Sequence, residues 1–422
     1  EQRVNSAGLD LADDSALQAL ADGLAQSAAT DWWARPLVAA QPSSWNASRA
    51  RPVLNPADHR DVVGVVIDAD RGEVDLAVSQ AVQAAGDWAA VPPAQRAACL
   101  RRAAHILEEG RAGLIGLIVR EAGKSLPSAL AEVREAVDFL RYYAEQAEAL
   151  PPAARPLGPV ACISPWNFPL AIFTGQVAAA LAAGNTVLAK PAEQTSLVAA
   201  QAVAALHESG IPAAALQLLP GTGERAGAAL MENPQLAGVM FTGSFDVAKS
   251  IAGTLAQRLD DAGRVIPLIA ETGGVNAMIV DSSALAEQAV ADILVSAFDS
   301  AGQRCSALRL LCVQEDCADN LLEMLRGAMA QLRMGLPGRL ETDVGPLIDA
   351  ASQAAVEAHI RAMRAAGFDV EQLDRGAECR HGTFVPPTLI MLDAVGDLER
   401  EVFGPVLHVV RYRSEELDGL ID

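Results

Sequence analysis

Residues 159–190 read PVACISPWNFPLAIFTGQVAAALAAGNTVLAK. The stretch contains two short apolar runs, Val160–Ser164 and Thr186–Lys190, each of a length typical of buried strands. Between them, the apolar residues of 170–183 predict a helix. A strand, a helix and a second strand in this order are typical of a parallel sheet, because parallel neighbours need a long crossover connection. This stretch therefore predicts an α/β fold.

The alternation of strands and helices continues past Lys190. The further elements predicted for the first series lie at 195–209, 216–219, 223–231, 238–242 and 245–258. A second series follows Arg264, with elements predicted at 265–270, 277–280, 285–298, 308–313, 317–333 and 404–412. We therefore expect two doubly wound, Rossmann-like α/β units, in which ligands bind at the carboxyl ends of parallel strands.

The chain of 422 residues is too long for one ordinary core, which favours two or three domains. We interpret residues 1–50 as an N-terminal arm or linker, because they hold one helical pattern and then a Pro/Ser stretch. Residues 51–264 form the first predicted domain and residues 265–422 the second.

The composition excludes several functional classes. The 53 acidic and 32 basic residues give a formal net charge of −21, which disfavours binding to nucleic acid or anionic lipid. The apolar runs are too short or too interrupted to predict a transmembrane segment. The six cysteines are scattered and include no CxxC pair, so we predict neither a metal site nor disulfides. Free thiols and the absence of a signal peptide pattern favour a cytoplasmic location.

Cys305 lies in the segment FDSAGQRCSA, residues 298–307, between a predicted helix and a predicted strand. A cation such as Arg304 favours the thiolate, and Gly302 lets a ligand approach closely. A lone cysteine is more often a small buried hydrophobe, so the assignment needs support from other segments.

Polar residues follow several predicted strands. Asn167 stands between Pro165 and Pro169, where it is either a turn residue or half of an oxyanion hole. Glu271 precedes two glycines, a setting that suits a general base acting on water. Ser244 opens a helix, either as a simple N-cap or beside amides that face a pyrophosphate.

Lys190 and Glu193 end another predicted strand at the same edge. They either pair with each other or bind ribose hydroxyls, where a carboxylate would repel a 2′-phosphate. The glycine-rich turn 221–227 lies between a strand and a helix, but its spacing differs from the dinucleotide fingerprint. Glu401 adds one more acid on a turn.

Six segments taken together are specific. They are FDSAGQRCSA, ETGG, PWNFP, KPAEQT, FTGS and EVFGPV, and at these positions the chain resembles the aldehyde dehydrogenase superfamily from about residue 50 to its end. The resemblance implies an NAD-binding unit and a catalytic unit, and NAD-dependent oxidation of an aldehyde through a cysteine thiohemiacetal and thioester.

The resemblance also implies roles for individual residues. It places the nucleophile on Cys305, the general base on Glu271, and the oxyanion hole on the Asn167 side chain with the Cys305 N–H. The NAD-contacting residues that it implies are Ser164, Trp166, Lys190, Glu193, Gly223, Gly227, Gly243, Ser244, Glu401 and Phe403. Substrate contacts fall on Ser306 and Phe168.

Within NAD, the resemblance assigns Lys190 and Glu193 to the adenosine ribose. Ser244 and the helix after it would approach the pyrophosphate, and Glu401 would bind the nicotinamide ribose.

One branch of the superfamily is especially similar. The segment NSAGLDL at residues 5–11, the Trp-containing arm and GQRCSALR resemble the L-glutamate γ-semialdehyde (1-pyrroline-5-carboxylate) dehydrogenases that form half of bifunctional proline utilization A. This branch implies proline catabolism, a homo-oligomer with an oligomerisation element near 145–158, and FAD only in a proline dehydrogenase half outside this chain. The family continues for roughly another 70–80 residues, so we expect a C-terminally truncated catalytic unit.

Three other functions stay open at this point. The chain could oxidise another small aldehyde, act only as an inactive NAD-binding fragment of this fold, or pass an acyl group to coenzyme A. The presence of Glu271 favours hydrolysis over acyl transfer, because coenzyme A would replace the water that this residue activates.

Overall fold

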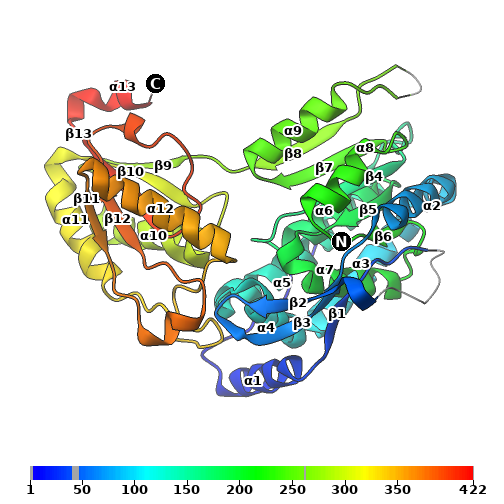
Figure 1. The fold of residues 1–422 in the computed structure, drawn as a ribbon, viewed down its shortest axis with the longest axis horizontal. Coiled ribbons are helices and arrows are strands. Elements are labelled where there is room, and N and C mark those ends of the chain that lie inside the picture. The colour runs from blue at the N-terminus through cyan, green and yellow to red at the C-terminus, as the bar shows by residue number, and fades with distance from the viewer. Residues whose placement is uncertain (1–2, 40–46, 261–262, 422) are drawn as a thin grey trace. The chain divides into compact units, whose positions relative to one another are not determined.

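The computed structural model describes residues 3–39, 47–260 and 263–421. It forms two compact units. The first comprises residues up to 54, 61–122 and 129–272, and the second comprises 55–60, 123–128 and the residues from 273 onward. Figure 1 labels the helices and strands of each unit.

The first unit is built on a five-stranded parallel sheet with the strand order β6-β5-β4-β7-β8. Its strands are β4 (Pro159–Ile163), β5 (Thr186–Lys190), β6 (Leu216–Leu218), β7 (Gly238–Gly243) and β8 (Leu268–Thr272). Every residue of β4 and β5 is buried, as expected for central strands covered on both faces. The predicted strands at 160–164 and 186–190 are therefore confirmed.

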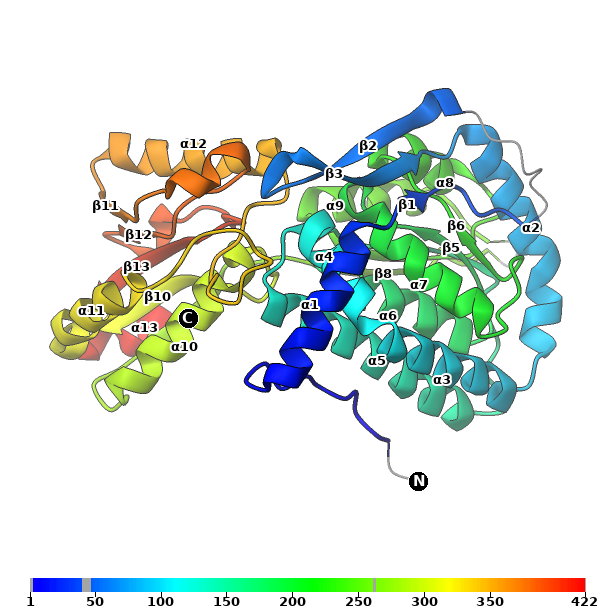
Figure 2. The ribbon, with the colours of Figure 1, turned by 90° about the horizontal axis from the view of Figure 1, so that it is seen from below.

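The first unit contains the helices α1 (Asp14–Ala28), α2 (Arg71–Ala90), α3 (Pro93–Glu109), α4 (Arg111–Ala122), α5 (Leu126–Ala149), α6 (Ala171–Ala182), α7 (Ser196–Glu208), α8 (Ala228–Glu232) and α9 (Phe245–Leu255). Some of them cover the two faces of the sheet, and α1, α3 and α4 pack on other helices. Helices α2, α8 and α9 share one core with alternate residues of β4 and β7, while α6 and α7 pack on the opposite face (Figure 2).

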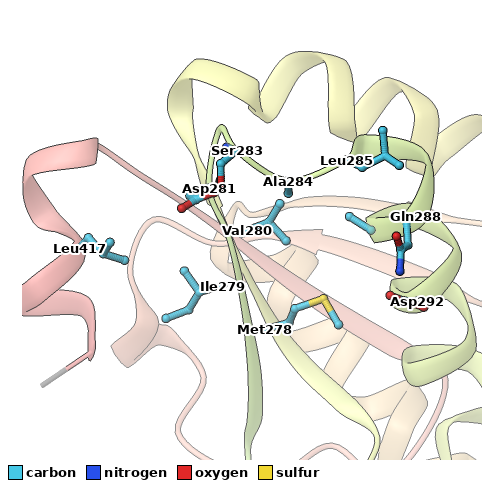
Figure 3. Close-up of a pocket in the computed structure, with 11 residues that line it drawn as sticks. Met278, Ile279, Val280, Asp281, Ser283, Ala284, Leu285, Gln288, Asp292 and Leu417 are labelled. Atoms are coloured by element: carbon cyan, nitrogen blue, oxygen red, sulfur yellow. Dashed lines mark hydrogen bonds between the residues drawn. The ribbon is translucent and has the colours of Figure 1, made fainter.

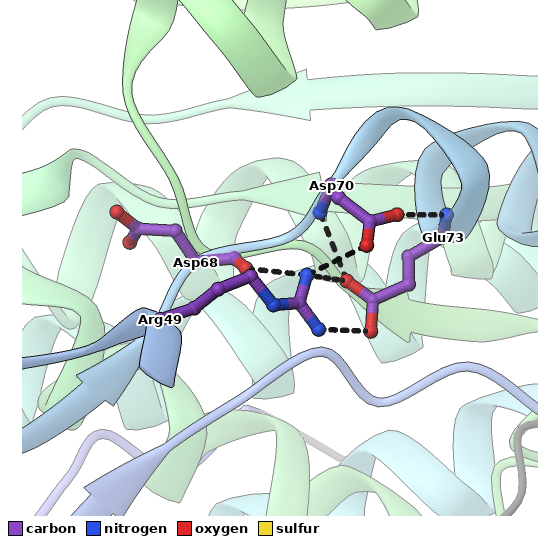
Figure 4. A network of polar contacts seen from close by, with 4 residues as sticks. All are labelled: Arg49, Asp68, Asp70 and Glu73. Carbon is purple, nitrogen blue, oxygen red and sulfur yellow. Dashed lines mark hydrogen bonds and ion pairs between the residues drawn. The ribbon is translucent and has the colours of Figure 1, made fainter. Parts of the chain in front are cut away.

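A small sheet with the order β1-β3-β2 joins this unit through a polar network. Its strands are β1 (Trp32–Ala34), β2 (Ala50–Asn55) and β3 (Asp58–Ile67). Asp70 and Glu73 form a capping box that starts α2. Arg49, just before β2, donates to both oxygens of the Glu73 carboxylate at 2.6 and 3.0 Å and to Asp70 at 2.9 Å (Figure 4). The hydrogen bond to Glu73 raises the pKa of Arg49, so this guanidinium stays charged.

The N-terminal arm is part of the first unit. Its helix α1 packs against α4, and the Ser27 hydroxyl donates to the Gly113 carbonyl at 2.9 Å. The Trp32 indole donates to the Ser27 carbonyl at 2.9 Å. A methyl group added at Gly116 would lie 2.6 Å from the Ser27 Cβ, so the two helices approach closely where this glycine stands.

The second unit holds a mixed sheet with the order β11-β12-β13-β10-β9, in which only β11 is antiparallel to its neighbour. Its strands are β9 (Asn276–Val280), β10 (Leu308–Gln314), β11 (Asp369–Gln372), β12 (Thr388–Met391) and β13 (Val406–Tyr412). Its helices are α10 (Ala286–Phe298), α11 (Glu315–Met329), α12 (Ala350–Ala366) and α13 (Leu417–Ile421). Helix α12 lies on one side of the sheet and α10 and α11 on the other (Figure 2).

One strand lies in a different sheet from the one we expected. The prediction began the second α/β series at Val265, but β8 pairs with β7 and completes the first sheet. Glu271 lies on this strand and therefore in the first unit, which ends at Thr272. The alternation of apolar runs marks a strand correctly, but it does not tell which sheet the strand joins.

Two buried glutamates cap helices of the first unit from outside those helices. The Glu121 carboxyl group accepts the backbone N–H groups of Leu197 and Val198, in the first turn of α7, at 2.7 and 2.8 Å. The Glu132 carboxyl group accepts the N–H groups of Leu170 and Ala171, at the start of α6, at 3.2 and 3.0 Å. Each carboxyl group satisfies amides that have no partner inside the helix.

Among the described residues, no helix is both long enough and apolar enough to cross a bilayer.

Substituting Glu121 tests the buried cap. Burial raises the pKa of Glu121 to about 8, and the two N–H groups oppose that rise. Because Glu121→Gln places an amide NH₂ against a backbone N–H, we expect a loss of about 1–3 kcal/mol in unfolding free energy. Because the pKa of Glu121 is higher in the folded protein than in the unfolded protein, its contribution to stability is complete below the unfolded-state pKa. That contribution is lost as the pH rises toward 8. The gap between wild type and variant should therefore narrow between pH 5 and pH 8.

Thermal unfolding across this pH range measures the gap, and Glu208→Gln at the exposed end of α7 is the control. A constant gap, or one that widens with pH, would contradict the assignment.

Candidate functional site

The carboxyl ends of the parallel strands in the first unit lie along one edge of the sheet, and the predicted residues collect there. Ser164, Trp166, Asn167 and Phe168 follow β4, and Lys190 ends β5 with Glu193 just beyond it. Gly223 and Gly227 follow β6, Gly243 and Ser244 stand at the end of β7, and Glu271 lies near the end of β8. Eleven of the predicted site residues thus lie at the same end of one sheet, where its parallel strands terminate.

The segment after β4 is mostly buried. Asn167 is 8% exposed, and Trp166 and Phe168 are half-buried on either side of it. The backbone N–H of Ser164 donates to the Lys190 carbonyl at 3.2 Å. The Ser164 hydroxyl is buried and has no hydrogen-bond partner within the part of the chain that the structure describes. A buried hydroxyl without a partner is costly, which favours a ligand group at this position.

The Lys190 amine is buried beside the carboxyl end of its strand, where it donates to the Pro191 carbonyl at 3.0 Å. Burial lowers the pKa of Lys190 to about 8, and the nearby Glu193 carboxylate opposes that shift. A charged amine and a half-buried carboxylate are donors and acceptors that suit the hydroxyl groups of a ribose.

The glycine-rich turn forms a short π-helical segment, Gly223–Gly227, before α8. A methyl group added at Gly227 would lie 3.6 Å from the Lys190 Cε, so the turn runs directly over the lysine side chain. Ser244 is the N-cap of α9, and its hydroxyl accepts the Val247 N–H at 3.4 Å. The N-terminus of this eleven-residue helix opens at the same edge of the sheet, where its amides favour an anion.

Glu271 is exposed on β8, the edge strand, and pairs in register with Thr242 of β7. In the first unit, therefore, a carboxylate, a buried amide and the groups suited to a nucleotide follow neighbouring parallel strands.

In the second unit, Cys305 lies in the loop of residues 299–307, which we name the Cys305 loop. After Asp299, three of its residues lie in the left-handed region, namely Ser300 (φ 55°), Ala301 (φ 54°) and Gly302 (φ 66°). A side chain at Gly302 would collide with the Gly404 carbonyl oxygen, so both its backbone angle and its position require glycine. The turn leaves the Cys305 side chain exposed, whereas four of the other five cysteines are buried and Cys317 is half-buried.

Several polar side chains fix this loop. The Asn276 amide donates to the Cys305 carbonyl at 2.7 Å and to the Ala307 carbonyl at 3.0 Å. The buried Gln303 amide donates to the Ser300 and Pro346 carbonyls at 3.0 and 3.1 Å. Its oxygen accepts the Ile348 N–H at 2.9 Å. Arg304, which the sequence suggested as a cation for the thiol, is paired with Asp299 at 2.6 Å.

Arg309, at the start of β10, is fully buried and joins the Cys305 loop to the turn of residues 401–404. Its Nη1 donates to the Gly302 carbonyl at 2.6 Å, and its Nη2 donates to the Arg304 carbonyl at 2.8 Å and to the Glu401 Oε1 at 3.2 Å. The guanidinium carbon lies 5.1 Å from the centre of the Phe403 ring. Arg309 therefore contacts both predicted cofactor residues of this unit.

The Glu401 carboxylate is half-buried between Arg309 and two glycines. A side chain at Gly273 would collide with the Glu401 Oε2, and the Gly274 N–H stabilises the carboxylate. Burial raises the pKa of Glu401, while Arg309 and the Gly274 N–H oppose this shift. The close approach of Glu401 thus explains the glycine at 273, whereas Gly274 contributes its backbone N–H.

The structure divides the predicted residues into two groups. The first unit holds Asn167, Glu271 and the adenosine-side residues, and the second holds Cys305, Ser306, Glu401 and Phe403. The sequence analysis missed Arg309, Gln303 and Asn276. Arg309 offered a signal, because it is a charged residue inside a run of apolar residues that predicts a buried strand.

A cavity of about 370 Å³ opens beside β9 and α10 in the second unit (Figure 3). It is lined by the carboxyl-terminal part of β9, Asp281, Ser283, part of α10 and Leu417 of α13. None of the described residues that line it belongs to the predicted site. The predicted residues of this unit instead lie before the amino ends of β10 and β13.

The chain is similar in sequence and in structure to known proteins. Residues 45–417 match the model of the aldehyde dehydrogenase family. Bifunctional protein PutA of Klebsiella aerogenes is 58% identical over 427 residues, covering all of this chain and 32% of its own length. The chain thus spans about a third of the PutA relatives.

Two shorter relatives carry the same resemblance. The 1-pyrroline-5-carboxylate dehydrogenase of Anoxybacillus flavithermus is 36% identical over 84% of this chain and 72% of its own length. A solved structure of a variant of the Thermus thermophilus 1-pyrroline-5-carboxylate dehydrogenase is 30% identical, with a TM-score of 0.91 over 99% of this chain and 84% of that one. The chain therefore belongs to the aldehyde dehydrogenase family.

Proposed function

We propose that this chain oxidises L-glutamate γ-semialdehyde, the open form of 1-pyrroline-5-carboxylate, to L-glutamate with NAD as the hydride acceptor. The observation that carries the proposal is the Cys305 loop, in which an exposed cysteine follows a glycine turn and is held by three buried or half-buried side chains. The similarity to 1-pyrroline-5-carboxylate dehydrogenases supports this aldehyde over other small aldehydes.

The described residues fit the cofactor. The unpartnered Ser164 hydroxyl, the buried Lys190 amine and the Glu193 carboxylate share one edge of the first sheet, and the amides of α9 open at the same edge. These groups would hold the adenosine ribose and the pyrophosphate, with Trp166, Gly223, Gly227 and Gly243 beside them. Glu401 and Phe403 would hold the nicotinamide end. NAD, when bound, supplies the acceptor for the hydride.

The protein residues act on the aldehyde in two stages. In the first, the Cys305 thiolate attacks the aldehyde carbon, a C–S bond forms, and the Asn167 amide and the Cys305 N–H stabilise the oxyanion. Loss of the hydride leaves a thioester on Cys305. In the second, Glu271 takes a proton from water, the water attacks the thioester carbon, and the C–S bond breaks to release the acid. Ser306 and Phe168 would position the substrate.

The same proposal gives each region a role. Residues 51–264 would bind NAD, and residues 265–422 would carry the nucleophile. The general base Glu271 lies on β8, which belongs to the sheet of the first unit. The segment 145–158 would contribute to a homo-oligomer. A proline dehydrogenase half that holds FAD, as the relatives named bifunctional suggest, would lie outside this chain.

Replacing the nucleophile tests the reaction. Cys305→Ala should abolish NADH formation from L-glutamate γ-semialdehyde, while NAD affinity should stay within about threefold because the binding groups lie elsewhere. The assay uses the longest natural polypeptide that contains this chain. Cys317→Ala, at a half-buried cysteine of α11, is the matched control and should keep full turnover. Turnover by Cys305→Ala would overturn the proposal.

Replacing Glu193 tests the choice of cofactor. A 2′-phosphate beside its carboxylate would meet a like charge and lose a hydrogen bond, at a cost on the order of 2 kcal/mol. NAD should therefore be preferred over NADP in kcat/KM, and Glu193→Gln should narrow the ratio. Glu208→Gln, at the exposed end of α7, should leave the ratio unchanged. Equal efficiency with both cofactors in the wild type would refute the preference.

A further inference from the structure

The buried guanidinium of Arg309 contacts two segments of the second unit at once. Its side chain is 0% exposed, and it donates to two carbonyls of the Cys305 loop and to one carboxylate oxygen of Glu401. Burying a guanidinium is unfavourable unless hydrogen bonds and an opposite charge compensate it. Arg309 therefore requires the Cys305 loop and the 401–404 turn to be in place together.

The two segments also touch each other without Arg309. The Gly302 Cα faces the Gly404 carbonyl so closely that a side chain at Gly302 would collide with it. Arg309 donates to the carbonyls on both sides of this contact, since its Nη1 reaches the Gly302 oxygen at 2.6 Å and the Gly404 oxygen at 3.4 Å. The two segments are thus held together by a backbone contact and by hydrogen bonds from one guanidinium.

A pair of histidines forms hydrogen bonds that fix the backbone of Arg309. The Arg309 carbonyl can only accept, so His408, 3.1 Å away, donates its Nδ1–H. Burial lowers the pKa of His408 to about 4, so the neutral ring presents an unprotonated Nε2 to His359. The Nε2 of His359, at 2.8 Å, is therefore the donor in this pair. The pair fixes the position of Arg309 from the side of α12 and β13.

We propose that Arg309 is a positioning residue, which orients the Glu401 carboxylate toward the nicotinamide ribose and holds the backbone that presents Cys305. This inference rests on the proposed function, because Glu401 meets a ribose only if the chain binds NAD. Arg309 contacts neither substrate nor cofactor in this scheme. It acts on the cofactor through Glu401 and on the thiol through the carbonyls of Gly302 and Arg304.

A double-mutant cycle tests the first of these effects. Arg309→Met and Glu401→Gln should each weaken NAD affinity about tenfold, and the double variant should be within about twofold of Glu401→Gln alone. Affinity is measured by fluorescence titration without substrate, in the longest natural polypeptide that contains this chain. Arg326→Met removes an exposed ion pair with Glu371 and should change nothing. Losses that add in the double variant would overturn the role through Glu401.

Alkylation of Cys305 by iodoacetamide, measured without cofactor or substrate, tests the second effect. Arg309→Met should change the alkylation rate by about threefold or more, and Arg309→Lys should restore part of the wild-type rate because it keeps the charge but not the fork of donors. An unchanged rate in Arg309→Met would overturn the role at the thiol. If Arg309→Met does not fold, Arg309→Lys takes its place in both measurements.

The two proposals fail differently. Absence of NAD binding in the wild type, or turnover by Cys305→Ala, contradicts the proposed function. Normal NAD binding and turnover combined with additive losses contradict only the role of Arg309.

Discussion

The buried guanidinium of Arg309 orders the part of the second unit that carries the cysteine. A buried charge is tolerated where hydrogen bonds and an opposite charge compensate it. Here the two Nη atoms donate to two loop carbonyls and the Glu401 carboxylate, while the Nε has no partner among the described residues. The left-handed turn before Cys305 costs backbone energy, and the same hydrogen bonds help to offset it. Strain in the loop and the cost of burying the charge are therefore compensated by one set of contacts.

The predicted site residues lie at opposite ends of the strands in the two units. In the first unit, the polar residues follow the carboxyl ends of parallel strands, as is typical of doubly wound sheets. In the second unit, the Cys305 loop precedes β10, the 401–404 turn precedes β13, and the Gly273–Gly274 pair precedes β9. Three amino ends thus supply the second group, while the cavity at the carboxyl end of β9 has no predicted site residue.

Local patterns predicted much of this structure. The apolar runs at 160–164 and 186–190 became β4 and β5, because a strand buried on both faces has a clear local signal. Sheet membership is not local, so β8 was assigned to the wrong series and Glu271 with it. Arg309 was read as part of an apolar strand, since its partner Glu401 lies 92 positions away in the sequence. The partner of a buried charge can be identified only once the fold has brought the two residues together.

The position of Arg309 on a strand makes the number of residues after Cys305 a constraint in its own right. The pairing of β10 with β9 shifts its register between Leu308 and Leu310, at the position of Arg309, and such an irregularity can redirect a side chain. Three residues separate Cys305 from Arg309, whose guanidinium donates back to the Gly302 and Arg304 carbonyls. A loop of another length would move these carbonyls away from the guanidinium unless the strand register shifted with it. The loop can change its composition more easily than its length.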